Sequence, residues 1–254
     1  MGKRPRIADK LLNLASPLAF LAVWELASVS GFVPKFLFPP PSSIFSRIFT
    51  MFLTGGLLRD SGLSLMRITT GLAAGTLLGV FLGLLAGRMK LFRRMIHPIV
   101  SLSYPVPKIA IIPFLILFFG IGETSKIVLI GLGGFFLVYL STLHGVMCID
   151  PRYFDAARIF SLSRTDTWTK IVLPATLPSI FNGIKLATGM CFILVVASEF
   201  IGGSSGIGYR IWNSWENFDV TGMFAALFVI SFLGWIFGEV VDLTAKACMP
   251  WRRS

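Results

Sequence analysis

The sequence predicts an all-α membrane protein in which about six transmembrane helices form a single domain. Of its 254 residues, 55% are hydrophobic and only 14% are charged, and the mean hydropathy is +0.80. Soluble domains carry about 25% charged residues, so this composition argues against that class. The apolar residues gather in runs long enough to cross a bilayer, and a charged island at 150–178 interrupts them.

The first predicted span covers 14–33, and Glu25 lies near its middle. A carboxylate inside a membrane is costly and is a functional-site candidate by default. Two interpretations of Glu25 stay open, a polar residue of the translocation path or a group paired within the helix bundle. After this span, 34–66 are expected to form an extracytoplasmic connection that contains an amphipathic surface helix.

The second predicted span, 68–86, carries glycine at every fourth position: Gly71, Gly75, Gly79, Gly83 and Gly87. Small residues at this spacing let two membrane helices approach closely. Each four-residue step drifts by about 40° around the helix. The stripe should therefore wind, and we expect neighbours on several sides of this helix.

The remaining predicted spans are 105–119, 127–147, 180–201 and 221–243. The third opens with Tyr104-Pro105-Val106-Pro107, and a Gly-rich turn joins it to the fourth. The fifth ends near Glu199, which is the second carboxylate that could line a translocation path.

The basic residues predict the orientation of the spans. Fifteen of the 23 Lys and Arg residues fall in the N-terminal tail, the loop after the second span, the charged island and the C-terminal tail. Cytoplasmic loops of membrane proteins carry such an excess. Both termini and the island are therefore expected in the cytoplasm. The same pattern explains the net charge of +11 without nucleic-acid binding.

The charged island, 150–178, predicts two short helices. Asp150 followed by Pro151 is typical of an N-cap with proline at the first helical position. Ser163 and Asp166 have the spacing of a capping box, which begins a second helix. Leu173-Pro174 should end that helix, because the residue before a proline is pushed out of the helical region.

This island resembles the signature loop of bacterial ABC importer permeases. That loop has Glu-Ala-Ala, three residues, Gly, and a spacer that ends in Leu-Pro. The matching positions in this chain, with the intervening arginine, are Asp155, Ala156, Ala157, Arg158, Ser161, Leu173 and Pro174. Asp replaces Glu and Ser replaces Gly, and serine adopts positive φ less readily than glycine. The resemblance implies a type I importer permease fold, with 150–178 as the cytoplasmic loop that couples to an ATPase.

Further stretches resemble the nitrate, sulfonate and taurine branch of these importers. They include Tyr104-Pro105-Val106-Pro107, 119–126 and Ser198-Glu199-Phe200-Ile201-Gly202. The resemblance implies import of a small anion across the bacterial cytoplasmic membrane by alternating access. It implies a second permease copy, two ATPase subunits and a periplasmic or lipid-anchored solute-binding protein. This chain has no phosphate-binding loop, so ATP and Mg are expected on the partner.

Two other classes of membrane protein fit less well. An ion-coupled secondary transporter without an ATPase could use Glu25 or Glu199, but no internal repeat is visible. A membrane enzyme would need a catalytic set, and neither that set nor a cofactor site is visible. Cys148, Cys191 and Cys248 are scattered without metal-ligand spacing, so we predict no metal site.

Overall fold

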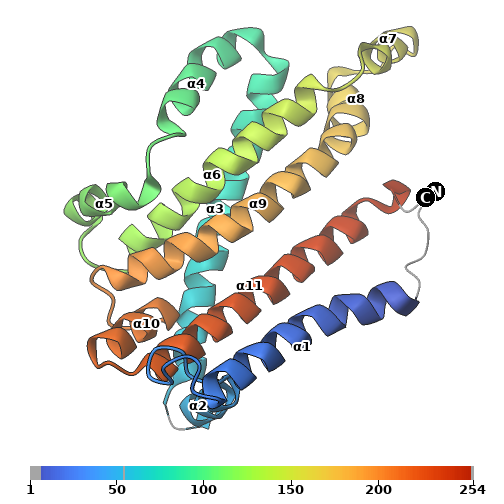
Figure 1. Ribbon diagram of the computed structural model, residues 1–254. Helices are drawn as coiled ribbons and strands as arrows, with labels where there is room; N and C mark the ends of the chain where they lie inside the picture. The colour runs from blue at the N-terminus through green and yellow to red at the C-terminus, as the bar shows by residue number, and fades with distance from the viewer. Residues whose placement is uncertain (1–6, 54, 253–254) are drawn as a thin grey trace. The chain divides into compact units, whose positions relative to one another are not determined.

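The computed structural model describes residues 7–53 and 55–252, with side chains from 15 to 251, and the described residues hold no β-strand. The helices in chain order are α1 (Ile7–Val29), α2 (Pro41–Leu53), α3 (Leu57–Arg88), α4 (Lys90–Ser103), η1 (Lys108–Ile111), α5 (Ile112–Phe119), α6 (Glu123–Met147), α7 (Pro151–Ile159), α8 (Arg164–Thr167), the π-helical turn η2 (Trp168–Val172), α9 (Leu173–Phe200), α10 (Ile207–Glu216), α11 (Val220–Cys248) and η3 (Pro250–Arg252) (Figure 1).

The chain divides into two compact units. The first comprises the described parts of Met1–Arg59 together with Arg210–Val229, and the second comprises Asp60–Tyr209 and the described part of Ile230–Ser254. In the first unit, Trp24 of α1 packs edge-on against Phe224 of α11, and Ile44 of α2 lies in the same apolar cluster. Burial of these apolar side chains stabilises the packing of α1 and α2 against the start of α11.

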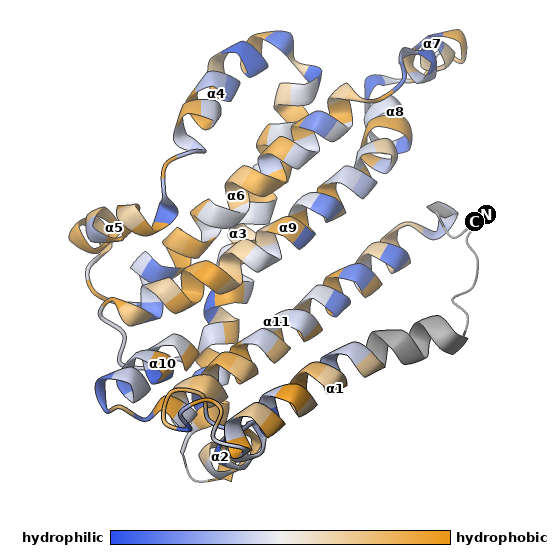
Figure 2. Ribbon diagram, viewed as in Figure 1, coloured by the Kyte–Doolittle hydropathy of each residue, from blue (hydrophilic) through white to orange (hydrophobic). Residues whose placement is uncertain are grey.

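Four helices of the described chain are long and apolar enough to cross a membrane: Leu57–Arg88, Glu123–Met147, Arg164–Phe200 and Val220–Cys248. A fifth span results if α4 and the η1–α5 segment count as one broken span, and the apolar part of α1, Ala15–Val29, is shorter. In Figure 2, hydrophilic residues lie on α7, on α8 and at the start of α4 and recur along α9, α10 and α11, while α5 is hydrophobic.

The glycine stripe is a contact face, as predicted, but it follows one helix. A Cβ atom added at any of the five glycines would meet α6, from Ile130 opposite Gly71 to Val146 opposite Gly87. The helix α3 has other neighbours as well, since its Ser64 and Arg67 bind Glu199 of α9, but the glycines themselves all face α6. The angular drift does not carry the stripe away from α6, since each successive glycine meets a position about four residues further along that helix.

The third predicted span, 105–119, corresponds to η1 and α5 and begins at a sharp break in the chain. The basic stretch expected as a loop forms α4, and the chain then bends by 94° before η1 and α5. Pro105 and Pro107 lie in the break. Because proline has no backbone N–H, neither residue can donate the hydrogen bond that would continue the helix.

The prediction that Leu173-Pro174 ends a helix is wrong. Helical structure continues from Arg164 to Phe200, with the π-helical turn η2 just before Leu173. Pro174 falls in the first turn of α9, where a missing N–H costs little. At η2 the backbone hydrogen bonds change from the α-helical to the π-helical pattern. The helix thereby continues past Pro174 without a break.

Candidate functional site

The predicted ATPase-coupling loop, 150–178 (the docking loop), begins with a locally capped helix, α7. The Asp150 side chain accepts a hydrogen bond of 2.9 Å from the Arg152 N–H, and Pro151 occupies the first turn. Both features confirm the N-terminal signal read from the sequence.

A Schellman motif ends α7, with Ser161 at its left-handed position. The Leu162 N–H donates to the Ala157 carbonyl at 2.9 Å, and the Ser161 N–H donates to the Arg158 carbonyl at 3.0 Å. Ser161 has φ of 50°, so the serine itself adopts the conformation for which glycine is favoured. The replacement of glycine therefore leaves the turn left-handed at this position.

The second short helix of the loop also has its predicted cap. The Asp166 N–H donates to Ser163 Oγ at 3.0 Å, and Ser163 Oγ donates to the Asp166 carboxylate at 2.6 Å. Lys170 pairs with the other Asp166 oxygen at 2.6 Å. Side chains from α7 and η2, including Phe154 and Trp168, then pack on a cluster around Val146 and Val172, which fixes the loop on the end of α6.

The structure separates the predicted coupling residues by exposure. Asp155, Arg158, Ser161 and Leu173 are exposed, Ala156 and Pro174 are half-buried, and Ala157 is only 5% exposed. Ala157 therefore faces the interior of this chain. The outward surface of α7 instead carries apolar side chains that sequence reasoning did not single out: Tyr153, Ile159 and Phe160. Exposed aromatic and aliphatic groups on a charged loop are typical of a protein interface.

A polar cavity of about 400 Å³ lies under α7. Its lining includes Arg88 from the end of α3, and the Arg88 guanidinium lies 4.6 Å from the Phe154 ring centroid. The basic end of α3 and the docking loop are therefore on the same side of this unit, as the charge pattern predicted.

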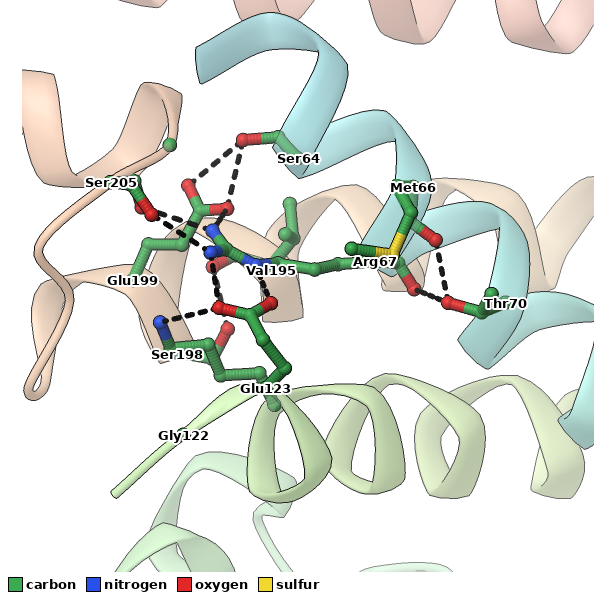
Figure 3. Close-up of polar contacts among 12 residues, drawn as sticks. Ser64, Met66, Arg67, Thr70, Gly122, Glu123, Val195, Ser198, Glu199 and Ser205 are labelled. Carbon is green, nitrogen blue, oxygen red and sulfur yellow. Dashed lines mark hydrogen bonds and ion pairs between the residues drawn. The ribbon is translucent and has the colours of Figure 1, made fainter. Parts of the chain in front are cut away.

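A second candidate site is a buried charge cluster around Arg67 (Figure 3). Arg67 belongs to α3, and its side chain is fully buried. It forms ion pairs with two carboxylates. Its Nη1 lies 2.6 Å from Glu199 on α9, and its Nε and Nη2 form a bidentate pair with Glu123 on α6 at 2.5 and 2.6 Å. One guanidinium thus ties three helices together.

The same cluster holds the start of α10. The Gly206 N–H donates to Asp60, the Ile207 N–H to Ser64 Oγ and the Gly208 N–H to Glu199, at 2.8–3.0 Å. The first N–H groups of a helix lack partners within the helix, so these side chains satisfy them. Arg67 also donates to the Ser205 carbonyl and hydroxyl. The cluster therefore fixes the 201–208 connection on α3, α6 and α9.

The two carboxylates proposed for a translocation path are both engaged. Glu199 has no exposed surface and accepts from Arg67, Ser64 and Gly208. Glu25 accepts from the Ser42 N–H at 2.9 Å and from its hydroxyl at 2.7 Å, which caps the start of α2. The described geometry favours the paired interpretation of Glu25.

Sequence reasoning did not identify Arg67. Its partners lie 56 and 132 positions away, beyond the reach of any local motif. One signal was available, because a charge at the edge of an apolar span requires an opposite charge, and Glu123 and Glu199 stand at span ends. Among the residues that the structure describes, no group of His, Cys, Asp or Glu could hold a metal ion.

Comparisons with known proteins agree with this architecture. Residues 75–253 match the family described as "Binding-protein-dependent transport system inner membrane component". The chain is 32% identical to a Bacillus subtilis (strain 168) protein named as an aliphatic sulfonates transport permease, SsuC, over 95% of this chain and 88% of that protein. It is 29% identical to the taurine transport system permease protein TauC of Escherichia coli (strain K12), over 94% and 89%.

A solved structure shares the fold. The inward-facing MetNI methionine ABC transporter aligns with a TM-score of 0.66 at 21% identity, over 78% of this chain and 97% of that one. At this identity the match supports the fold of a type I ABC importer permease but does not indicate which solute this chain transports. The chain belongs to the binding-protein-dependent transport system inner membrane component family and is a multi-pass permease subunit of an ABC importer, a transport subunit whose ATPase is a separate polypeptide.

Proposed function

We propose that this permease imports a small sulfonate-class anion, such as an aliphatic sulfonate or taurine, with nitrate as a related candidate. The similarity to permeases named for sulfonates and taurine, over more than nine-tenths of this chain, carries the proposal. The binding protein sets much of the selectivity in such importers.

The assembly that we propose contains two copies of this chain, two ATPase subunits and a periplasmic or lipid-anchored binding protein. The assembly lies in the bacterial cytoplasmic membrane with both termini of the permease in the cytoplasm. The basic residues support this orientation, because they concentrate in the tails, the start of α4 and the docking loop.

The mechanism that we propose is alternating access driven through the docking loop. ATP and Mg²⁺ bind the ATPase subunits, whose closure moves α7 and α8. Moving a two-state equilibrium from 1:99 to 99:1 takes about 5.5 kcal/mol of differential binding. The packing of α7 and η2 on the end of α6 gives that motion a route into the membrane helices.

The proposed solute is tested in two steps. A thermal-shift screen of the binding protein encoded beside this permease identifies its ligands, and we expect stabilisation by sulfonates or taurine. Uptake of the same compounds into vesicles with the reconstituted importer should then require ATP. Stabilisation by unrelated solutes only, such as amino acids or sugars, would contradict the substrate class.

The orientation has its own test. Single cysteines at Arg164 and Asn213 are labelled in intact cells, after Cys148, Cys191 and Cys248 are replaced. We expect a membrane-impermeant reagent to label position 213 and to spare position 164. The opposite pattern would place the docking loop outside the cytoplasm and exclude the proposed coupling.

A further inference from the structure

A buried lysine occupies the break between α4 and α5. Lys108 is 5% exposed, and its Nζ donates three hydrogen bonds, to the carbonyls of Ser103, Tyr104 and Val106, at 2.9, 3.0 and 2.8 Å. Only a protonated ammonium has three N–H groups to donate, so this geometry fits the charged form. The Nζ also lies 4.2 Å from the centroid of the Phe136 ring.

Among the residues whose side chains the structure describes, no carboxylate forms an ion pair with this ammonium. The carbonyl dipoles orient the ammonium without cancelling its charge. Phe136 lies near the middle of α6, which runs from Glu123 to Met147, so the ammonium lies beside the middle of that apolar helix. A charge inside a membrane protein is costly even when backbone carbonyls bind it, and such residues mark the pathways of solutes.

A cavity of about 230 Å³ adjoins the ammonium. Its lining carries the Lys108 ammonium and the Tyr104 phenol among mostly apolar side chains, which include Val106, Phe136, Leu137 and Met190. Binding sites for drug-sized molecules occupy about 300–1,000 Å³, so this cavity suits a smaller solute. One positive group beside an apolar wall matches a molecule with an anionic head and a short hydrocarbon tail.

We propose that this cavity is a transient solute site within the permease, with the anionic head at Lys108 and the tail against Leu137 and Met190. The inference rests on the proposed function and deepens it. The anion would take one ammonium N–H from a backbone carbonyl, so binding is an exchange of hydrogen bonds and stays weak. Weak binding suits a transport pathway, because the solute must leave the site again.

The test compares uptake of straight-chain alkanesulfonates of one to six carbons by the complete reconstituted importer. The Met190→Phe variant enlarges a wall side chain and should lower uptake of the six-carbon compound about tenfold or more relative to the one-carbon compound. Lys108→Met keeps a similar length but removes the charge, and it should lower uptake of the whole series by about tenfold or more. The control is Met95→Phe, at a residue of α4 that is 64% exposed and outside the cavity, and it should keep the wild-type profile.

Separate results overturn the two proposals. Wild-type importer that takes up neither the series nor taurine nor nitrate refutes the proposed function, and the site inference falls with it. Uptake of taurine or nitrate without any of the series keeps the proposed function and refutes the site. Wild-type uptake combined with an unchanged chain-length profile in Met190→Phe refutes the site alone, whether or not Lys108→Met assembles. Equal loss of every compound in Met190→Phe also refutes the site, since that result indicates a purely structural contact.

Discussion

Ser161 holds the left-handed position of a Schellman motif, with φ of 50°. The left-handed conformation destabilises a non-glycine residue by roughly 1–2 kcal/mol. Glycine avoids this strain but lowers the free energy of unfolding by about 0.4–1 kcal/mol, because the unfolded chain gains conformational entropy. Ser161→Gly should therefore stabilise the end of α7 by up to about 1 kcal/mol. Hydrogen exchange at the Leu162 N–H, which bonds the Ala157 carbonyl, should slow up to about fivefold.

The matched control at this position is Ser161→Ala, which keeps the Cβ atom and hence the strain. Its exchange rate should stay close to that of the wild type. Faster exchange in the Gly variant would mean that the serine conformation carries no strain and that backbone entropy dominates.

Arg67 binds two carboxylates whose surroundings differ. The Glu199 side chain is fully buried, whereas that of Glu123 is 47% exposed. Glu199→Gln leaves a buried guanidinium poorly compensated and should cost about 3 kcal/mol. Solvent screens the half-exposed Glu123 carboxylate, so Glu123→Gln should cost about 1 kcal/mol or less.

Thermal unfolding of the purified permease in detergent measures this difference. Glutamine is nearly isosteric with glutamate, so both variants test charge rather than packing. Equal losses of stability in the two variants would show that the burial of Glu199 does not decide the energetics of the cluster.

At the level of elements, α3 and α6 pack through glycine. A Cβ atom at Gly79 would lie 3.0 Å from the Phe135 carbonyl oxygen and the Tyr139 nitrogen, which are backbone atoms that cannot turn aside. Gly79→Leu should therefore force the helices apart and prevent accumulation of folded permease. Leu78→Val is the control, because Leu78 is exposed one position away. Normal yield and uptake of Gly79→Leu would exclude this contact.

The elements that the sequence predicted well are those with local signals. The N-caps at Asp150 and Ser163 depend on residues two or three positions apart, so the sequence displays them directly. The third span was predicted to open at Tyr104-Pro105-Val106-Pro107, where the break lies, but the helix α4 before it was missed because its basic residues favoured a loop. The stop at Leu173-Pro174 failed because tertiary packing of η2 carries the helix past a local breaker.

The candidate sites also differ in how much of each one a local sequence signal reveals. The position of the docking loop followed from its spacing, but its outward face did not, because the two alanines of the motif do not reveal which side packs inward. The Arg67 cluster and the Lys108 cavity combine residues from separate helices. No periodicity in one segment can display such a combination, and only the cost of unpaired charge in a membrane points to it.

At the level of the whole importer, the exposed face of α7 should bind the ATPase. Phe160 is 76% exposed, and Ile159 and Tyr153 lie exposed on the same short helix. Phe160→Asp places a charge where an apolar contact is expected and should release the ATPase during purification, with loss of solute uptake. The permease itself should keep its unfolding temperature, because this side chain lies outside its core.

Two further variants at the docking loop separate contact from folding. Asp155→Glu keeps the charge and restores the residue usual in the family, so complex and uptake should stay normal.

Ala157→Trp would crowd a buried position beside Phe154 and Leu162 and should cost about 1–3 kcal/mol of permease stability. The measurements are co-purification of the ATPase, solute uptake and permease unfolding temperature. Full complex and uptake with Phe160→Asp would place the ATPase contact elsewhere, and an unchanged unfolding temperature with Ala157→Trp would mean that α7 is free to move away from α3.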